Sequence, residues 1–137
     1  MWKLYALLAA LFAALTAIFA KIGVKDIDSN LAAAIRVSFV LLFTWGVALF
    51  SGAGRELKSV GGHTLFFLLL SALAASLSWL FYFKALQVGD VSKVAPLDKL
   101  SVALVIFFGI LVLGEPVDLK TILGGLLILG GSLLLLI

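Results

Sequence analysis

Four ionisable side chains lie inside long apolar runs, and they are the residues best suited to do chemistry. They are Arg36, Lys84, Asp98 and Lys99. At ~1.5 Å per helical residue they share one depth, roughly 8–10 Å or less from the same membrane face. Each buried charge costs several kcal/mol unless it is paired or hydrated. The set therefore indicates either a hydrated cavity wall that binds substrate or relays protons, or an Arg36–Asp98 ion pair with both lysines reaching the surface.

Trp79 is the aromatic side chain that we expect in the wall of such a cavity. Ser71, Ala75 and Ser78 place small or polar atoms on neighbouring helix faces. An aromatic ring can bind a cation or a flat apolar body. Rings in membrane proteins also commonly face lipid, so both interpretations stay open.

Pro96 precedes the Asp98–Lys99 pair and has two interpretations. If a helix has already begun by Ser92, the proline kinks it and frees the carbonyl of Ser92 toward a cavity. If the helix begins later, Pro96 lies in its first turn and no kink is needed. We favour the first-turn position, with Asp90 or Ser92 as the cap.

The composition decides what kind of chain must position these residues. Of 137 residues, 64% are hydrophobic and only 12% charged. A soluble domain is excluded because so few charges cannot cover a solvated surface. The net charge of +3 is scattered, so nucleic acid is not an expected partner. There is no cysteine, and His63 has no second ligand in reach, so we expect no metal, no cofactor and no catalytic site.

Apolar runs long enough to cross a ~30 Å hydrocarbon core define the predicted elements. They predict an all-α integral membrane protein with five transmembrane helices, at about 2–20, 31–50, 64–86, 92–113 and 117–137. The Gly-rich, charged stretch 51–63 is predicted to be a surface loop. We expect this chain in a prokaryotic plasma (inner) membrane.

An odd number of spans puts the termini on opposite faces, and the basic residues are almost balanced between those faces. The N-terminal face has Lys3, Arg55, Lys58 and Lys120, and the other face has Lys21, Lys25, Lys84 and Lys93. Basic residues orient membrane proteins only where they are unequal. We favour dual topology, in which copies insert both ways and pair antiparallel. The alternative is one orientation, fixed by the deeper Arg36 and Lys99 or by a partner.

Several motifs in order along the chain resemble the EamA-like family of the drug/metabolite transporter superfamily. They are Ala20-Lys21-Ile22-Gly23, Asn30-Leu31-Ala32 before Ile35-Arg36, 79–85 (WLFYFKA), 94–102 (VAPLDKLSV) and Leu113-Gly114-Glu115. The resemblance covers nearly the whole chain. Members of the family usually carry two such five-helix repeats, and this sequence resembles a single one, a domain of residues 1–137.

The resemblance implies a secondary transporter for a small metabolite or drug-like solute rather than an enzyme. Inverted-repeat transporters bind substrate between two repeats, so a lone repeat requires a second copy of itself or an oppositely oriented half-size partner. The candidates for substrate or coupling are Asp98, Lys99, Arg36, Lys84 and Trp79. Their net positive charge favours an anionic or zwitterionic metabolite. Two alternatives are a subunit of a flippase for a lipid-linked intermediate and a membrane scaffold that transports nothing.

Overall fold

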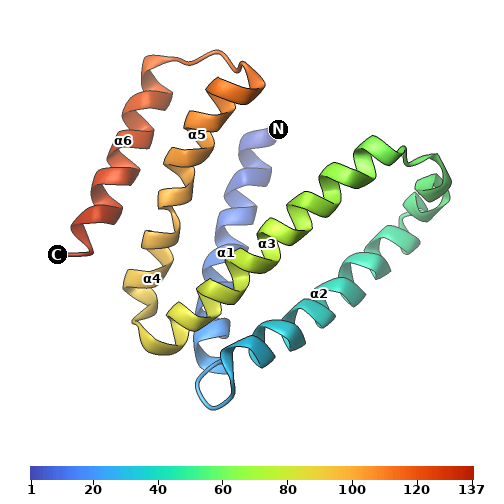
Figure 1. Cartoon of the computed structure of the whole chain (residues 1–137), viewed down its shortest axis with the longest axis horizontal. Coiled ribbons are helices and arrows are strands. Elements are labelled where there is room, and N and C mark those ends of the chain that lie inside the picture. Colours follow the sequence, from blue (N-terminus) through green and yellow to red (C-terminus); the bar gives the residue numbers. More distant parts are fainter. The chain divides into compact units, whose positions relative to one another are not determined.

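The computed structural model describes all residues, 1–137, and every regular element in it is helical (Figure 1). The α-helices are α1 (Trp2–Gly23), α2 (Ser29–Phe50), α3 (Gly62–Val88), α4 (Val91–Asp98), α5 (Leu100–Leu113) and α6 (Leu119–Leu134). A 3-10 helix, η1 (Ala53–Ser59), lies within the stretch predicted to be a loop. The prediction of an all-α chain is therefore confirmed, and the predicted surface loop contains a short 3-10 helix with no buried residue.

Four stretches are long and apolar enough to cross a membrane. They are Trp2–Gly23, Ser29–Phe50, Gly62–Val88 and Val91–Leu113, the last being α4 and α5 together. The fifth predicted span, 117–137, forms a helix only over the 16 residues of α6. That length gives ~24 Å, short of the ~30 Å core. Four spans are thus supported by length and composition, and the fifth is a shorter apolar helix.

The chain divides into two compact units, Phe19–Gln87 and a second one made of Met1–Ile18 with Val88–Ile137. In the first unit, α2 leads to η1 and α3 returns from it (Figure 1). Asp28 begins α2 because its carboxylate accepts hydrogen bonds from the N–H groups of Asn30 and Leu31, at 2.9 and 3.1 Å. Gly52, at φ +81°, follows α2 in a left-handed conformation that a side chain would strain.

Polar side chains tie the end of α1 and the α1–α2 connection to the end of α3. Lys21 Nζ donates to the carbonyl of Leu86 at 2.6 Å, one of the last carbonyls of α3. Gln87 Nε2 donates to the carbonyls of Ile27, at 2.8 Å, and Val24, at 3.3 Å. Leu86 and Val24 are fully buried there. These bonds fix the end of α3 and the α1–α2 connection together at one end of this unit.

In the second unit, α5 and α6 lie side by side as a hairpin (Figure 1). Gly114, at φ +65°, ends α5 in a left-handed conformation, and the N–H of Glu115 donates back to the carbonyl of Gly109 at 3.2 Å. Gly125 of α6 lies against Ile106 so closely that an added Cβ would meet its Cδ1 at 2.7 Å. A Cβ at this position would require the flexible end of the Ile106 side chain to shift, and glycine lets the two helices approach closely without that change.

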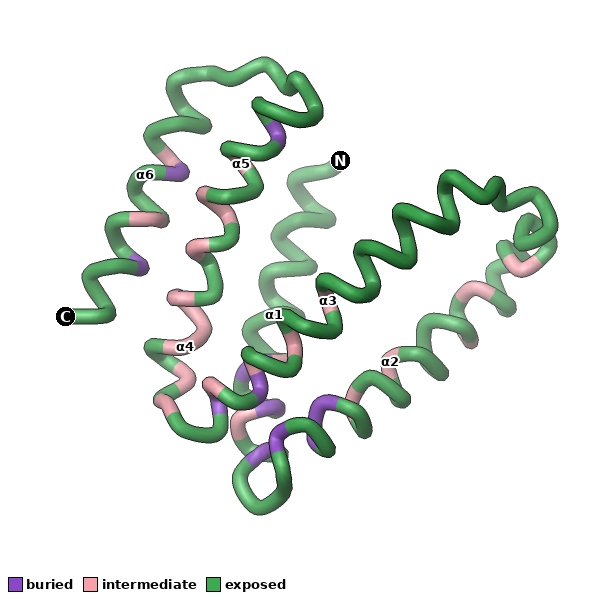
Figure 2. Tube along the Cα trace, in the orientation of Figure 1, coloured by how far each residue is buried: buried purple, intermediate pink, exposed green.

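Very little of the apolar surface is buried, as the scarcity of purple in Figure 2 shows. The buried hydrophobic residues are Ala17, Ala20, Val24, Ala32, Ala33, Phe83 and Leu86. Large apolar side chains lie exposed along every one of the long helices. Such a surface is stable only against lipid or another apolar surface, as in an integral membrane protein.

Candidate functional site

The fourth predicted span is broken in the structure, and the break falls at the charged pair. Helix α4 ends at Asp98, Lys99 is a single turn residue, and α5 begins at Leu100. Around the break the backbone changes to i→i−3 hydrogen bonds, from Lys99 N–H to Pro96 carbonyl at 3.0 Å and from Val102 N–H to Lys99 carbonyl at 2.9 Å. This tighter turn is typical of hinges and of functional interruptions in helices.

Pro96 lies inside α4, three residues before the turn residue Lys99. Helix α4 begins at Val91, because the carbonyl of Asp90 accepts from the N–H groups of Lys93 and Val94 at 3.0 and 2.9 Å. Pro96 is then the sixth residue of the helix and lies inside it. The predicted first-turn position was therefore wrong, since the helix has already begun by Ser92, and the predicted kink stays a prediction. With no N–H on Pro96, the i→i−4 bond to the carbonyl of Ser92 cannot form.

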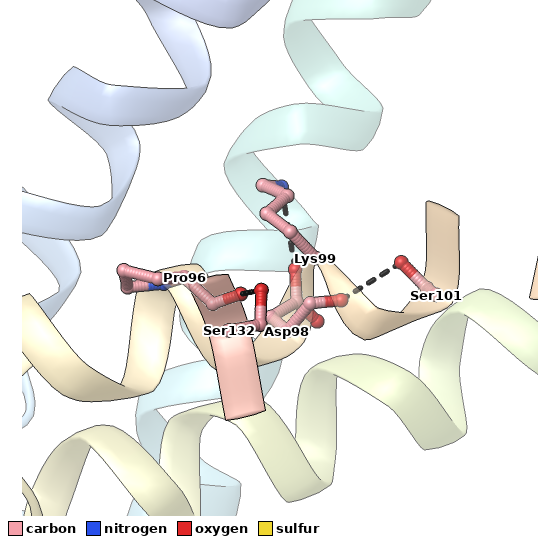
Figure 3. A network of polar contacts seen from close by, with 5 residues as sticks. All are labelled: Pro96, Asp98, Lys99, Ser101 and Ser132. Carbon is pink, nitrogen blue, oxygen red and sulfur yellow. Dashed lines mark hydrogen bonds and ion pairs between the residues drawn. The ribbon is translucent and has the colours of Figure 1, made fainter. Parts of the chain in front are cut away.

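A buried hydroxyl of α6 forms a hydrogen bond to the backbone just before the break. Ser132 is 5% exposed, and its Oγ donates to the carbonyl of Pro96 at 2.9 Å, as Figure 3 shows. Ser101 Oγ donates to the backbone carbonyl of Asp98 at 2.8 Å, so both carbonyls at the break have a hydroxyl partner. Such bonds allow a broken helix to satisfy its backbone within a membrane.

The carboxylate of Asp98 remains accessible beside this break. Its nearest cation is Lys99, with 3.4 Å between Nζ and Oδ2. The two side chains are 38% and 54% exposed, so the pair is open rather than enclosed. No other part of the chain covers either group, so both are accessible to a ligand. Asp98 and Lys99 are neighbours in the sequence, and a substrate role for either stays a prediction.

Arg36 and Trp79 come together in the other unit. The Cζ of Arg36, on α2, lies 4.6 Å from the centroid of the Trp79 ring and 5.8 Å from that of Phe83, both on α3. Both distances are within the range of a cation–π interaction. Arg36 and Asp98 belong to different units, so their predicted ion pair stays a prediction. Lys84 is exposed on α3, where no contact of its side chain supports or excludes a role.

Two residues of this arrangement were missed from the sequence. Ser132 stands among leucines and glycines, and its polarity inside an apolar helix was the available signal. Gln87 lies just beyond the predicted span 64–86, whereas α3 continues through it and its side-chain amide donates to carbonyls of the α1–α2 connection. The aromatic partner of Arg36 could not be derived, since sequence spacing does not tell which helix faces meet.

Groups outside the spans have structural roles. Asp118 begins α6, and its carboxylate accepts from the N–H of Thr121 at 2.9 Å and from the Thr121 hydroxyl. These hydrogen bonds to the charged form lower the pKa of Asp118. His63, near the start of α3, stacks on Phe67 with 4.8 Å between ring centroids.

Comparison with known proteins gives a family and one named relative. The family described as "EamA-like transporter family" matches residues 1–137. A protein of Sinorhizobium sp., named "Uncharacterized transporter in cobO 3'region", is 47% identical over 134 residues. The alignment covers 98% of this chain and 95% of that protein. No solved structure matches the chain.

Proposed function

Because the chain belongs to the EamA-like transporter family, we propose that it is a secondary transporter that moves a small metabolite or drug-like solute by alternating access. The observation that carries this proposal is the break between α4 and α5 at Asp98 and Lys99. Transporters build their substrate and ion sites from such discontinuous membrane helices, whose interrupted backbone lines a cavity. The Sinorhizobium relative, which is covered almost end to end, is itself named a transporter.

Asp98 is the residue that we assign to coupling or to substrate binding. A carboxylate within a span is costly and has too short a side chain to reach the surface, so it needs a functional or structural partner. Its only ion-pair partner at the break is the exposed Lys99. Protonation of Asp98 would change the charge of the site during the transport cycle.

The working transporter is proposed to be a homodimer of two antiparallel copies in the plasma membrane. Residues 1–137 then form one domain that corresponds to a single repeat. The nearly equal numbers of basic residues on the two faces support insertion in both orientations. Two copies related by an axis in the membrane plane would enclose the path, which rocking of the protomers would open alternately to each side.

Helix α6 is proposed to be the fifth span of each copy. Its 16 residues are followed by Leu135, Leu136 and Ile137, which extend the apolar stretch. Local thinning of the bilayer accommodates a short span at a modest cost. Adding three lysines after Met1 should force one orientation, because added charge can decide topology. In that variant, N- and C-terminal reporters on opposite sides support five spans, whereas reporters on the same side contradict them.

The transport proposal is tested by solute-driven proton flux in proteoliposomes. The purified chain is reconstituted with a trapped pH-sensitive dye, and a panel of amino acids, carboxylates and amines is added outside. We expect at least one class to change the internal pH, and Asp98→Asn to reduce the rate at least tenfold. Glu56→Gln, which removes an exposed acid from η1, is the matched control and should retain the rate.

Solute entry with no proton movement, at the same rate in Asp98→Asn and in wild type, would contradict the assigned role of Asp98. A chain that is folded and reconstituted but moves no solute of any class would contradict the transport proposal itself. Radiolabelled uptake in parallel separates these two outcomes, because it does not depend on proton coupling.

A further inference from the structure

The guanidinium of Arg36 contacts two aromatic rings and has no polar partner. It lies within an apolar helix, 4.6 Å from the Trp79 ring and 5.8 Å from the Phe83 ring, measured from Cζ to centroid. It takes part in neither an ion pair nor a hydrogen bond, and no buried side-chain nitrogen in the structure lacks a partner. The guanidinium nitrogens therefore keep accessible surface.

The rings complement the charge of Arg36 but not its hydrogen-bonding capacity. A cation–π contact uses the face of the guanidinium plane, whereas its five N–H donors point outward within that plane. In a low-dielectric setting, donors without an acceptor are costly, and an anion that meets them is bound strongly. The fork of donors fits a carboxylate or a phosphate through two parallel hydrogen bonds.

The surrounding helices offer no acceptor of that kind. Neither α2 nor α3 contains an aspartate or a glutamate. The acids elsewhere in this unit are Asp26, Asp28 and Glu56, which lie in the α1–α2 connection and in η1. Asp28 is engaged at the start of α2. None of these carboxylates forms an ion pair with Arg36, so its donors are open to an acceptor from outside the unit.

We propose that Arg36, oriented by Trp79 and Phe83, is an oxyanion subsite of the transport path and binds a carboxylate or phosphate group of the substrate. The inference rests on the transport function proposed above and narrows its substrate to a small organic anion or zwitterion. Phe83 is buried, at 4% exposed, so its ring is fixed in place. The guanidinium of Arg36 lies over the Trp79 ring, which fixes its orientation. The N–H groups of the guanidinium are therefore already oriented to bind an anion in the free protein.

Trp79 provides the reporter for a direct binding test. With Trp2 and Trp45 replaced by phenylalanine, it is the sole tryptophan of the full-length chain. This variant, purified in an uncharged detergent, is titrated with benzoate and with inorganic phosphate at constant ionic strength. Benzamide, which has the same ring without the charge, is the matched probe. We expect a saturable change in Trp79 emission with either anion and none with benzamide.

Substitutions then assign the response to Arg36. Arg36→Gln should weaken anion binding about tenfold or more, since hydrogen bonds between charged groups are lost. Arg36→Lys keeps the charge and removes the two-pronged donor, so it should bind measurably weaker than wild type while it folds normally. Lys25→Gln removes an exposed cation of the same unit and should leave binding unchanged.

Three outcomes would overturn the subsite. The first is no response to soluble anions, or one that persists in Arg36→Gln. The second is a response only to added phosphatidylglycerol micelles, which would assign Arg36 to a lipid headgroup. The third is recovery, in the double variant Arg36→Asp with Asp98→Arg, of stability lost in each single variant, which would assign a structural ion pair.

The binding test and the flux test fail separately. Anion binding that depends on Arg36, in a protein that moves no solute, would support the proposed subsite and contradict the proposed transport. Flux of amines alone, with no anion binding at Trp79, keeps transport and contradicts the subsite.

Discussion

Replacement of Ser132 by alanine tests how the break between α4 and α5 is held. The buried Oγ of Ser132 donates to the carbonyl of Pro96 at 2.9 Å, and the same carbonyl accepts from Lys99 N–H at 3.0 Å. In Ser132→Ala the donor disappears together with its side-chain oxygen, and the carbonyl keeps its backbone partner. No buried polar group is therefore left without a partner, and the larger cost of such a group, about 1–3 kcal/mol, does not apply.

The remaining cost is that of one hydrogen bond between membrane helices. Such bonds contribute ~0.6 kcal/mol on average and ~1.7 kcal/mol at most. We expect Ser132→Ala to lower the free energy of unfolding by about 0.6–1 kcal/mol. Titration of the detergent-solubilised protein with dodecyl sulfate, followed by circular dichroism, measures this change. Hydrogen exchange at Lys99 should also become faster, because the turn around it is less restrained.

The matched control is Ser76→Ala. Ser76 Oγ donates at 2.8 Å to the carbonyl of Ala72 on the same helix, so its loss breaks no contact between helices. We expect a change within ~0.5 kcal/mol. If Ser132→Ala and Ser76→Ala have equal stability and exchange at Lys99 is unchanged, the hydroxyl does not hold the break and the reasoning is refuted.

Three further predictions concern packing and helix termini. Gly125→Leu should destabilise the α5–α6 hairpin by about 1–3 kcal/mol through overpacking. Gly124→Leu should be tolerated, because a Cβ at that position meets no atom within 4 Å. Equal unfolding curves of the two variants in dodecyl sulfate would refute this. Gln87→Leu should speed hydrogen exchange in the α1–α2 connection, since two carbonyls lose their donor; unchanged exchange there would contradict it. The pKa of Asp118 is lower in the folded than in the unfolded protein. Its contribution to stability is therefore fully present above the unfolded pKa and is lost as the pH falls through the folded pKa. Asp118→Asn should therefore flatten the pH dependence of stability in that acidic range, and an identical profile would contradict the assignment.

The helical segments could largely be predicted from the sequence because lipid imposes a length. Runs of about 20 apolar residues identified the first four spans to within a few residues. Helix ends were less predictable, since they depend on local contacts. Helix α3 continues through Gln87, past its predicted end at 86. Helix α6 begins at Leu119, after the cap Asp118, rather than at 117. The fifth span differs most, because apolar composition continued through residues that the helix does not include.

The unusual residues of the candidate site could be predicted from the sequence, but the contacts between them could not. Charge inside apolar runs identified Asp98 and Arg36 as unusual, and one of the two interpretations of Pro96 placed it within a helix that has already begun, as observed. The partners were not predictable. Arg36 meets Trp79, and Ser132 meets Pro96, across helices whose relative rotation the residue spacing does not determine. An apolar helix without a polar face has no periodic signal for that rotation.

The central claim is that a single repeat supplies its own inverted partner, and membrane orientation tests it most directly. Two reporters, one active only in the cytoplasm and one only outside it, are fused separately after Ile137. We expect signals of comparable strength from both fusions, because copies insert in both orientations. A signal from only one fusion would contradict the antiparallel homodimer and require a partner of opposite orientation or a parallel assembly.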